Sequence, residues 1–258
     1  MTAAMTPAER ISAAIRGARG GTAIVAFITA GFPKREQFRD HLTQVGNEAD
    51  VVEIGVPFTD PMADGMTIQR SSRAALDQGV SLRWLLQELE SMQRPRAPLL
   101  LMSYLNPLLA FGLENLAAAA ARAGVCGFIV PDLPYDESTD LRAALDAHGI
   151  ALIQMVTPVT EPARLEQLCA VSQGFIYAVT MTGTTGRTAS IGDVSAYLAN
   201  VRKVARLPVC AGFGIRNREQ VEALRAHCDG VIVGSALVEV LENGQDAAAF
   251  LKALRASG

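Results

Sequence analysis

The sequence predicts an α/β protein of the (β/α)8, or TIM, barrel class, and two observations carry the prediction. Short apolar runs alternate along the chain with stretches whose apolar residues recur at helical spacing. This alternation implies parallel strands joined by right-handed crossover helices. The apolar runs number eight in a chain of 258 residues, which is the strand count and the size of such a barrel.

The expected elements begin with an extra amphipathic helix at the N-terminus, over residues 7–16. The expected strands are residues 23–29, 51–54, 99–102, 127–130, 151–156, 175–179, 208–211 and 230–233. Helical periodicity covers residues 35–45, 82–92, 113–123, 137–147, 163–171, 194–204, 219–226 and 246–254. No linker or low-complexity tract divides the chain, so we expect one domain over residues 1–258.

The rival fold class is an open, doubly wound sheet, which often begins with a glycine-rich dinucleotide loop after its first strand. In this chain the first expected strand leads into Thr29-Ala30-Gly31-Phe32-Pro33, which lacks that pattern. The sequence therefore favours the closed barrel.

Composition excludes several classes of protein. Half of the residues are hydrophobic and 19% are charged, so extensive disorder is not expected. The net charge is −3 with no basic block, which argues against a nucleic-acid partner. The four cysteines form no Cys-x2-Cys pair and fit buried core positions in a reducing compartment. No apolar run is long enough to cross a membrane, so we expect a soluble cytoplasmic protein.

A long loop follows the second expected strand, at residues 55–65, and in a barrel it lies at the C-terminal face, where active sites form. Glu53 lies inside the apolar run before this loop, and a buried carboxylate is costly unless it is paired or faces a polar pocket. Glu53 is therefore either a structural salt-bridge partner or an acid–base catalyst with a raised pKa. Asp60 and Asp64 fit ordinary turns beside Pro and Gly, but Asp64 also lies near the Glu53 strand end.

Other catalytic groups are missing from the predicted strand ends. The three histidines fall on crossover helices or their ends, and no lysine lies within a strand. A histidine base, a metal site and a Schiff-base lysine are therefore not expected, and the chain contains no Gly-x4-Gly-Lys loop. These features predict acid–base chemistry by carboxylates, without a metal or a cofactor.

Three loops rich in small residues follow the last three expected strands, at residues 182–186, 212–215 and 234–235. Each alone fits an ordinary turn. Together they fit a phosphate site, because glycines let backbone N–H groups approach an anion and a helix starting near Ser235 adds its dipole. Barrels commonly bind phosphate after strands seven and eight. We therefore expect a phosphorylated small molecule as the ligand.

Several sequence motifs occur in an order typical of one known family. The longest, residues 52–69, reads VEIGVPFTDPMADGMTIQ. The shorter ones are FITAG at 27–31, NP at 106–107, PDLP at 131–134, GTTG at 183–186, GFGI at 212–215 and GS at 234–235. Together they closely resemble the tryptophan synthase alpha chain family over nearly the whole chain.

The resemblance implies a (β/α)8 barrel that cleaves indole-3-glycerol phosphate to indole and glyceraldehyde 3-phosphate in tryptophan biosynthesis. It implies that Glu53 and Asp64 form the catalytic pair. It also implies that Tyr177 and Thr185 contact the substrate, with Thr185 on a loop that closes beside Asp64. The residues implied at the phosphate are Gly186, Gly214, Gly234 and Ser235.

The partner implied by the resemblance is the tryptophan synthase beta chain, in an α2β2 heterotetramer. In that family the beta chain receives indole through a tunnel and joins it to serine with pyridoxal phosphate. We expect residues 57–66 to form the docking surface and residues 182–191 to close over the substrate.

The chemistry of indole is consistent with the lack of lysine and metal. Once its C3 is protonated, the indole ring itself accepts the electrons released by retro-aldol cleavage. Glu53 is expected to act as the acid–base group at C3 and at the side-chain hydroxyl, and Asp64 to bind the indole N–H. The apolar slot for the ring is expected to consist of Phe27, Leu101, Tyr177 and Phe213.

Two alternatives stay open from the sequence. Another phosphate-binding barrel enzyme would favour a lysine or cysteine at a strand end, which is not found. A non-catalytic barrel subunit would be indicated by loss of Glu53 or Asp64, and both are present.

Overall fold

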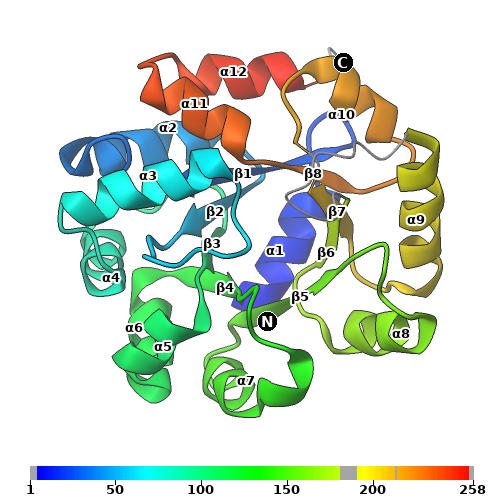
Figure 1. Ribbon diagram of the computed structural model, residues 1–258, viewed down its shortest axis with the longest axis horizontal. Helices are drawn as coiled ribbons and strands as arrows, with labels where there is room; N and C mark the ends of the chain where they lie inside the picture. Colours follow the sequence, from blue (N-terminus) through cyan, green and yellow to red (C-terminus); the bar gives the residue numbers. More distant parts are fainter. Residues whose placement is uncertain (1–4, 181–190, 213, 256–258) are drawn as a thin grey trace.

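Eight parallel strands close into a barrel in chain order (Figure 1). The computed structural model describes residues 5–180, 191–212 and 214–255. The strands are β1 Ala23–Thr29, β2 Val51–Gly55, β3 Leu99–Met102, β4 Val125–Ile129, β5 Ala151–Val156, β6 Ile176–Val179, β7 Val209–Gly212 and β8 Gly230–Val233. Because β8 pairs with β1 and every pairing is parallel, the predicted (β/α)8 barrel is confirmed.

Helices surround the strands and connect each to the next (Figure 1). They are α1 Pro7–Arg16, α2 Phe38–Glu48, α3 Met66–Asp77, α4 Leu82–Ser91, α5 Leu105–Phe111, α6 Leu113–Ala123, α7 Thr139–Asp146, α8 Pro162–Val171, α9 Ile191–Val204, α10 Arg218–Leu224, α11 Ser235–Glu242 and α12 Ala247–Leu254. Short 3-10 helices, η1 Arg35–Gln37 and η2 Tyr135–Glu137, precede α2 and α7. Within the described ranges, no helix is both long and apolar enough to cross a bilayer.

Alternate residues of each strand belong to two different apolar layers. In β2, Val51 packs with the residues that fill the barrel, whereas Val52 and Ile54 pack outward against the helices. Side chains alternate between the faces of a strand with a period of two. Glu53 therefore shares the inward phase of Val51.

Four strands, β2, β4, β6 and β7, have bounds that differ by one or two residues from the sequence prediction, and the starts of β4 and β7 have a physical reason. β4 begins at Val125 rather than at Gly127, because the pairing with β3 is irregular: Leu99 faces Val125 but Leu100 faces Gly127. β7 begins at Val209 rather than at Pro208. Proline has no N–H to donate to a neighbouring strand, although its carbonyl accepts the hydrogen bond from Ile176 N.

The extra N-terminal helix, α1, covers the end of the barrel opposite the long loop and is visible through the ring of strands in Figure 1. Its start is fixed by a reciprocal cap, in which Thr6 Oγ1 accepts from Glu9 N while the Glu9 carboxylate accepts from Thr6 N. Ile11 and Ile15 are fully buried among the residues that fill the barrel. The helix therefore seals this end of the barrel with apolar side chains.

Candidate active site

Glu53 points into the C-terminal mouth of the barrel from the middle of β2. It faces Phe27 of β1 and Leu100 of β3 in the sheet register. Its side chain is buried, and among the described residues its Oε2 atom has no hydrogen-bond partner. Burial, and secondarily the nearby charge of Asp64, raise the pKa of Glu53 to about 8. This carboxyl therefore holds its proton near neutral pH and is poised to act as an acid.

Asp64 reaches the same mouth from the loop between β2 and α3. The loop is held locally by Asp64 N, which donates to Pro61 O at 3.1 Å, and by Gln69 Nε2, which donates to Asp64 O at 2.8 Å. Burial raises the pKa of Asp64 to about 6, against the opposing effect of a hydrogen bond from Tyr104. Asp64 is therefore mainly ionised at neutral pH while Glu53 is mainly protonated.

Tyr104 is a site residue that the sequence analysis missed. It follows β3, is buried, and stacks on Phe58 with ring centroids 5.2 Å apart. Its hydroxyl accepts from Ala63 N at 2.9 Å and hydrogen-bonds the Asp64 side chain. Burial, and then the Asp64 charge, raise the pKa of Tyr104, so its hydroxyl stays neutral and can donate to the carboxylate. An aromatic residue at the end of the strand beside β2 was the available signal.

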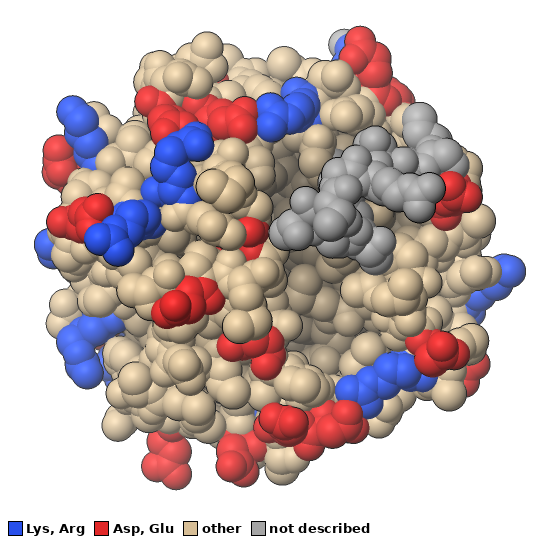
Figure 2. Space-filling view, in the orientation of Figure 1, with Lys and Arg blue, Asp and Glu red and all other residues tan. Residues whose placement is uncertain are grey.

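The two carboxylates share a cavity of about 240 Å³. Figure 2 shows the face of the molecule hollowed at its centre, over the ring of strands. The apolar wall of the cavity consists of Phe27, Ile68, Met102, Met155, Tyr177, Val179 and Ile232. Phe27 and Tyr177 are thus on the wall, as the sequence analysis expected.

Close backbone approaches fix the two aromatic rings of this wall. A Cβ atom at Gly55 would lie 2.4 Å from the Phe27 ring, and one at Gly212 would lie 2.8 Å from the Tyr177 ring. Any larger residue at either position would displace the ring that packs over it. Burial, with added effects of the nearby acids, raises the pKa of Tyr177, so its phenol is neutral in the cavity.

Leu101 is not brought to the cavity, contrary to the expectation that it forms the indole slot. It packs outward with Phe128 and the surrounding helices, whereas Leu100 and Met102 face the interior. The run 99–102 is apolar at every position, so its sequence does not show which residues point into the barrel and which point outward. The pairing of β3 with its neighbours determines this. Met102 lines the cavity in the place expected for Leu101.

The far end of the cavity is made of small residues. Gly214, Gly234 and Ser235 line it. No side chain caps the start of α11 at Gly234, so the first N–H groups of this helix have no partner within it. Such N–H groups and the helix dipole suit an anion. Gly186, the other residue expected at the phosphate, lies outside the described residues, as do Thr185, expected beside Asp64, Phe213, expected in the indole slot, and the expected closing loop except for Ile191.

Asp132 and Asp60 are not brought into the cavity. Asp132 Oδ1 accepts from Leu105 N at 2.9 Å and so fixes the turn after β3. Asp60 is exposed and accepts a hydrogen bond from the neighbouring Thr59 hydroxyl. Asp132 therefore has a structural role, and the exposed place of Asp60 fits the turn that the sequence left open for it.

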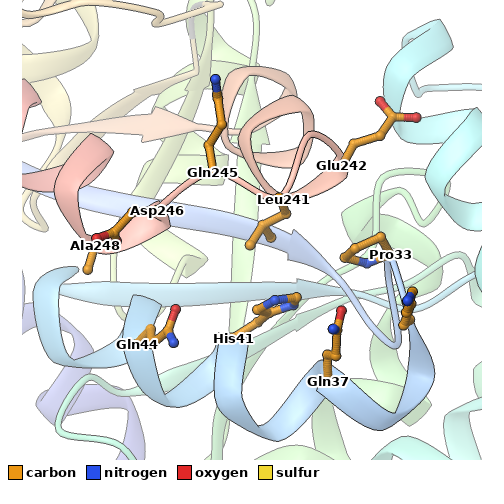
Figure 3. A pocket seen from close by; sticks show the side chains of 11 residues that line it. Pro33, Gln37, His41, Gln44, Leu241, Glu242, Gln245, Asp246 and Ala248 are labelled. Carbon is orange, nitrogen blue, oxygen red and sulfur yellow. The ribbon is translucent and has the colours of Figure 1, made fainter.

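A wider cleft of about 770 Å³ lies outside the barrel, between α2 and the turn from α11 to α12. Figure 3 shows Gln37 of η1 with His41 and Gln44 of α2 on one side, and Leu241 of α11 pointing in from the other. Its acids are already engaged: Glu242 pairs with Arg70, and Asp246 caps α12 through Ala249 N. It lacks the opposed carboxylates of the barrel mouth, so the smaller cavity is the candidate active site.

Known proteins match this architecture and sequence along nearly the whole chain. The family model for the tryptophan synthase alpha chain matches residues 14–257. A tryptophan synthase alpha chain of Nitratidesulfovibrio vulgaris (strain DP4) is 45% identical over 251 residues, covering 95% of this chain and 98% of the relative. One of Bacillus mycoides (strain KBAB4) is 44% identical over 238 residues, covering 91% and 92%.

Solved structures of tryptophan synthase also match the fold of this chain. The crystal structure of tryptophan synthase subunit alpha from Legionella pneumophila str. Paris superposes with a TM-score of 0.88 at 29% identity, covering 98% of both chains. An aminoacrylate-bound tryptophan synthase structure from M. tuberculosis gives 0.86 at 31% identity, covering 97% of this chain and 98% of that one. The chain belongs to the tryptophan synthase alpha chain family.

Proposed function

We propose that this chain cleaves indole-3-glycerol phosphate with Glu53 as the acid–base group and Asp64 as the ionised partner of the indole nitrogen. Its family makes the chain a carbon–carbon lyase of tryptophan biosynthesis. The observation that carries the residue assignment is the pair of carboxyls in one cavity whose pKa values are raised to about 8 and about 6. Environments that separate the pKa values of two acids typically separate an acid from an ion at neutral pH.

The cavity suits the three parts of this substrate. The apolar wall, including Phe27 and Tyr177, suits the indole ring, and the carboxyls suit its polar edge. Gly214 and Ser235, at the uncapped start of α11, suit the phosphate. A phosphate bound there by backbone N–H groups needs no lysine.

In the proposed reaction, protonated Glu53 gives its proton to C3 of the indole. The ring becomes an iminium-like cation, and ionised Asp64 accepts the indole N–H hydrogen bond and stabilises this charge. The Glu53 carboxylate then takes the proton of the hydroxyl beside C3. The carbon–carbon bond breaks, its electron pair returns to the ring, and indole and glyceraldehyde 3-phosphate leave with Glu53 protonated again. No step requires a metal or an organic cofactor.

We also propose that the beta chain docks on the mouth of the barrel. Exposed apolar side chains gather on segments that follow strands β2, β3 and β5: Met62, Met66, Leu109 and Val159. Exposed apolar groups on one face commonly mark a protein interface. Docking at residues 57–66 would reach the loop that carries Asp64, and the family resemblance supports an α2β2 assembly.

Cleavage of indole-3-glycerol phosphate, followed with and without a beta chain, tests the function and its residues together. We expect wild-type activity to rise through about pH 6, as Asp64 ionises, and to fall above about pH 8, as Glu53 loses its proton. Asp64→Asn should lower the rate by about 10²-fold or more. Wild-type-like activity of Asp64→Asn would refute its role, and no cleavage by the wild type under either condition would indicate a non-catalytic subunit.

The phosphate site has its own test by calorimetry with glycerol phosphate. Ser235→Asp places a negative charge at the start of α11 and should weaken binding strongly, whereas the uncharged Ser235→Ala should weaken it less. Equal affinities for the two variants would put the phosphate elsewhere.

Met62→Asp, on the exposed loop, should weaken binding of the beta chain while the isolated chain keeps its activity.

A further inference from the structure

A ladder of polar and charged side chains joins α3 to α11 beside the cavity. Arg70 binds Glu242 through two hydrogen bonds, at 2.9 and 2.6 Å. Three residues earlier on each helix, Thr67 donates to Glu239 at 3.2 Å. Glu239 also binds Arg216, from the segment after β7, at 2.7 and 3.1 Å. We call these five residues the α3–α11 ladder; Figure 2 shows basic and acidic side chains side by side over these helices, at the rim of the hollow.

Each side of the ladder leads to a different part of the cavity. Glu239 lies one helical turn after Ser235, on the helix whose start forms the phosphate end. Arg216 follows Gly214 by two residues, so its pair with Glu239 ties the β7 segment to the same helix. On the other side, α3 begins directly after Asp64 and Gly65, and Gln69 of α3 holds the Asp64 carbonyl.

The ladder is poorly placed to stabilise the fold as a whole. The Arg70 and Arg216 side chains are 55% and 57% exposed. Exposed ion pairs contribute little to the free energy of unfolding. Bidentate arginine–carboxylate pairs do, however, fix the relative orientation of the two side chains as well as their separation. The Glu239 and Glu242 pKa values are lowered by their arginines, so both acids stay charged across the neutral range.

We propose that the α3–α11 ladder is a positioning element that holds Asp64 at a fixed place relative to the bound phosphate. It rests on the proposed function and adds a role for residues that touch no substrate. Because the phosphate fixes α11 and the ladder fixes α3 to α11, phosphate binding also places the Asp64 carboxylate against the indole nitrogen. Binding energy from a part of the substrate that does not react is thereby used at the reacting centre.

Comparing the substrate with and without its phosphate isolates this role. Steady-state kcat and KM are measured for indole-3-glycerol phosphate and for indoleglycerol, with wild type, Glu239→Gln and Arg70→Gln. The matched control is Glu90→Gln, which breaks the exposed Arg122–Glu90 pair at 3.0 Å between α4 and α6, away from the cavity. Thermal unfolding of each variant establishes that it folds, and the two ladder variants test the element from both helices.

We expect each ladder variant to lower kcat for the phosphorylated substrate by about three- to thirtyfold. The kcat for indoleglycerol should change by less than about twofold, as for a surface substitution without a role in the reaction. The control should leave both unchanged. Equal losses on both substrates, or losses no greater than those of the control, would overturn the proposal. The proposed function itself fails separately, if the wild type does not cleave the substrate or does so without needing Asp64.

Discussion

Asp50 and Glu53 lie three residues apart in the chain, and the environments of their carboxylates are opposite. Asp50 Oδ2, just before β2, accepts hydrogen bonds from Ile24 N at 2.8 Å and from Arg255 at 3.0 Å. Glu53 is 1% exposed against 7% for Asp50, yet one of its oxygens has no partner in the described part of the chain. The first carboxylate is bound on the closed side of the barrel, and the second is left free at its mouth.

The two ends of β2 therefore serve different purposes. At the N-terminal end of a barrel, conserved chemistry usually supports stability, whereas the C-terminal end carries catalysis. A buried charge with all its partners is held in one state, while a buried acid without them changes its proton affinity instead. Asp50 therefore ties the end of the chain, through Arg255, to the first two strands, and Glu53 stays available for proton transfer.

The largest expected effect is on catalysis at the mouth. Glu53→Gln keeps the shape of the side chain but removes the titratable carboxyl group, so the cleavage rate should fall by about 10²–10⁴-fold. Single-turnover cleavage of indole-3-glycerol phosphate measures it. A variant within a few-fold of wild type would show that another group moves the proton.

On the closed side, the expected effect is on stability. Arg255→Met leaves the buried Asp50 carboxylate without its cation, and the free energy of unfolding should fall by about 3 kcal/mol. Urea unfolding measures the loss, with Arg122→Met, which breaks an exposed pair, as the control. The folded variant should keep wild-type kcat. Loss of kcat without loss of stability would reverse the division of roles.

The free carboxyl also predicts how stability depends on pH. Folding raises the pKa of Glu53 from 4.5 to about 8, so the folded state holds a proton that the unfolded state releases. The free energy of unfolding therefore falls progressively as the pH rises from about 4.5 to 8. Glu53→Gln removes that loss and should be more stable than wild type at pH 8.5 by about 1 kcal/mol or more. Parallel stability curves for the two proteins between pH 5 and 8.5 would contradict it.

The smallest expected effect belongs to Tyr104. Tyr104→Phe removes the hydrogen bonds to Asp64 and from Ala63 N while keeping the stacking on Phe58. Loss of one such hydrogen bond should lower kcat by about three- to tenfold and move the acid limb of the pH profile upward, because that bond lowers the Asp64 pKa. An unchanged acid limb would mean that the tyrosine only packs.

The barrel, and the presence of Glu53 and Asp64 in one cavity, could be predicted because local signals and the fold agree. A carboxylate inside an apolar run, as at Glu53, is rare enough to indicate a function or a pair. The loop that follows it carries Asp64, and connectivity alone brings the two to one end of a barrel. The eight apolar runs gave the strands for the same reason, since burial on both faces leaves a continuous apolar pattern.

Two site residues could not be predicted, because they depend on contacts between segments. The run containing Leu101 and Met102 is apolar throughout, so only the pairing of β3 with its neighbours decides which one turns inward. Tyr104 reaches Asp64 across two segments separated by 40 residues, and its place as an aromatic residue at a strand end does not by itself reveal that contact. Asp50 was not singled out either, because its partner, Arg255, lies at the other end of the chain.

The apolar side chains of α1 limit the routes by which small molecules can enter and leave the barrel. Ile11 and Ile15 fill the end of the barrel opposite the long loop, so a molecule beside Glu53 has no passage in that direction through the described residues. We therefore expect the substrate to arrive, and both products to leave, through the mouth of the barrel. A protein bound over that mouth would determine where the released indole goes next. The closed end therefore influences the fate of the product as much as the open end does.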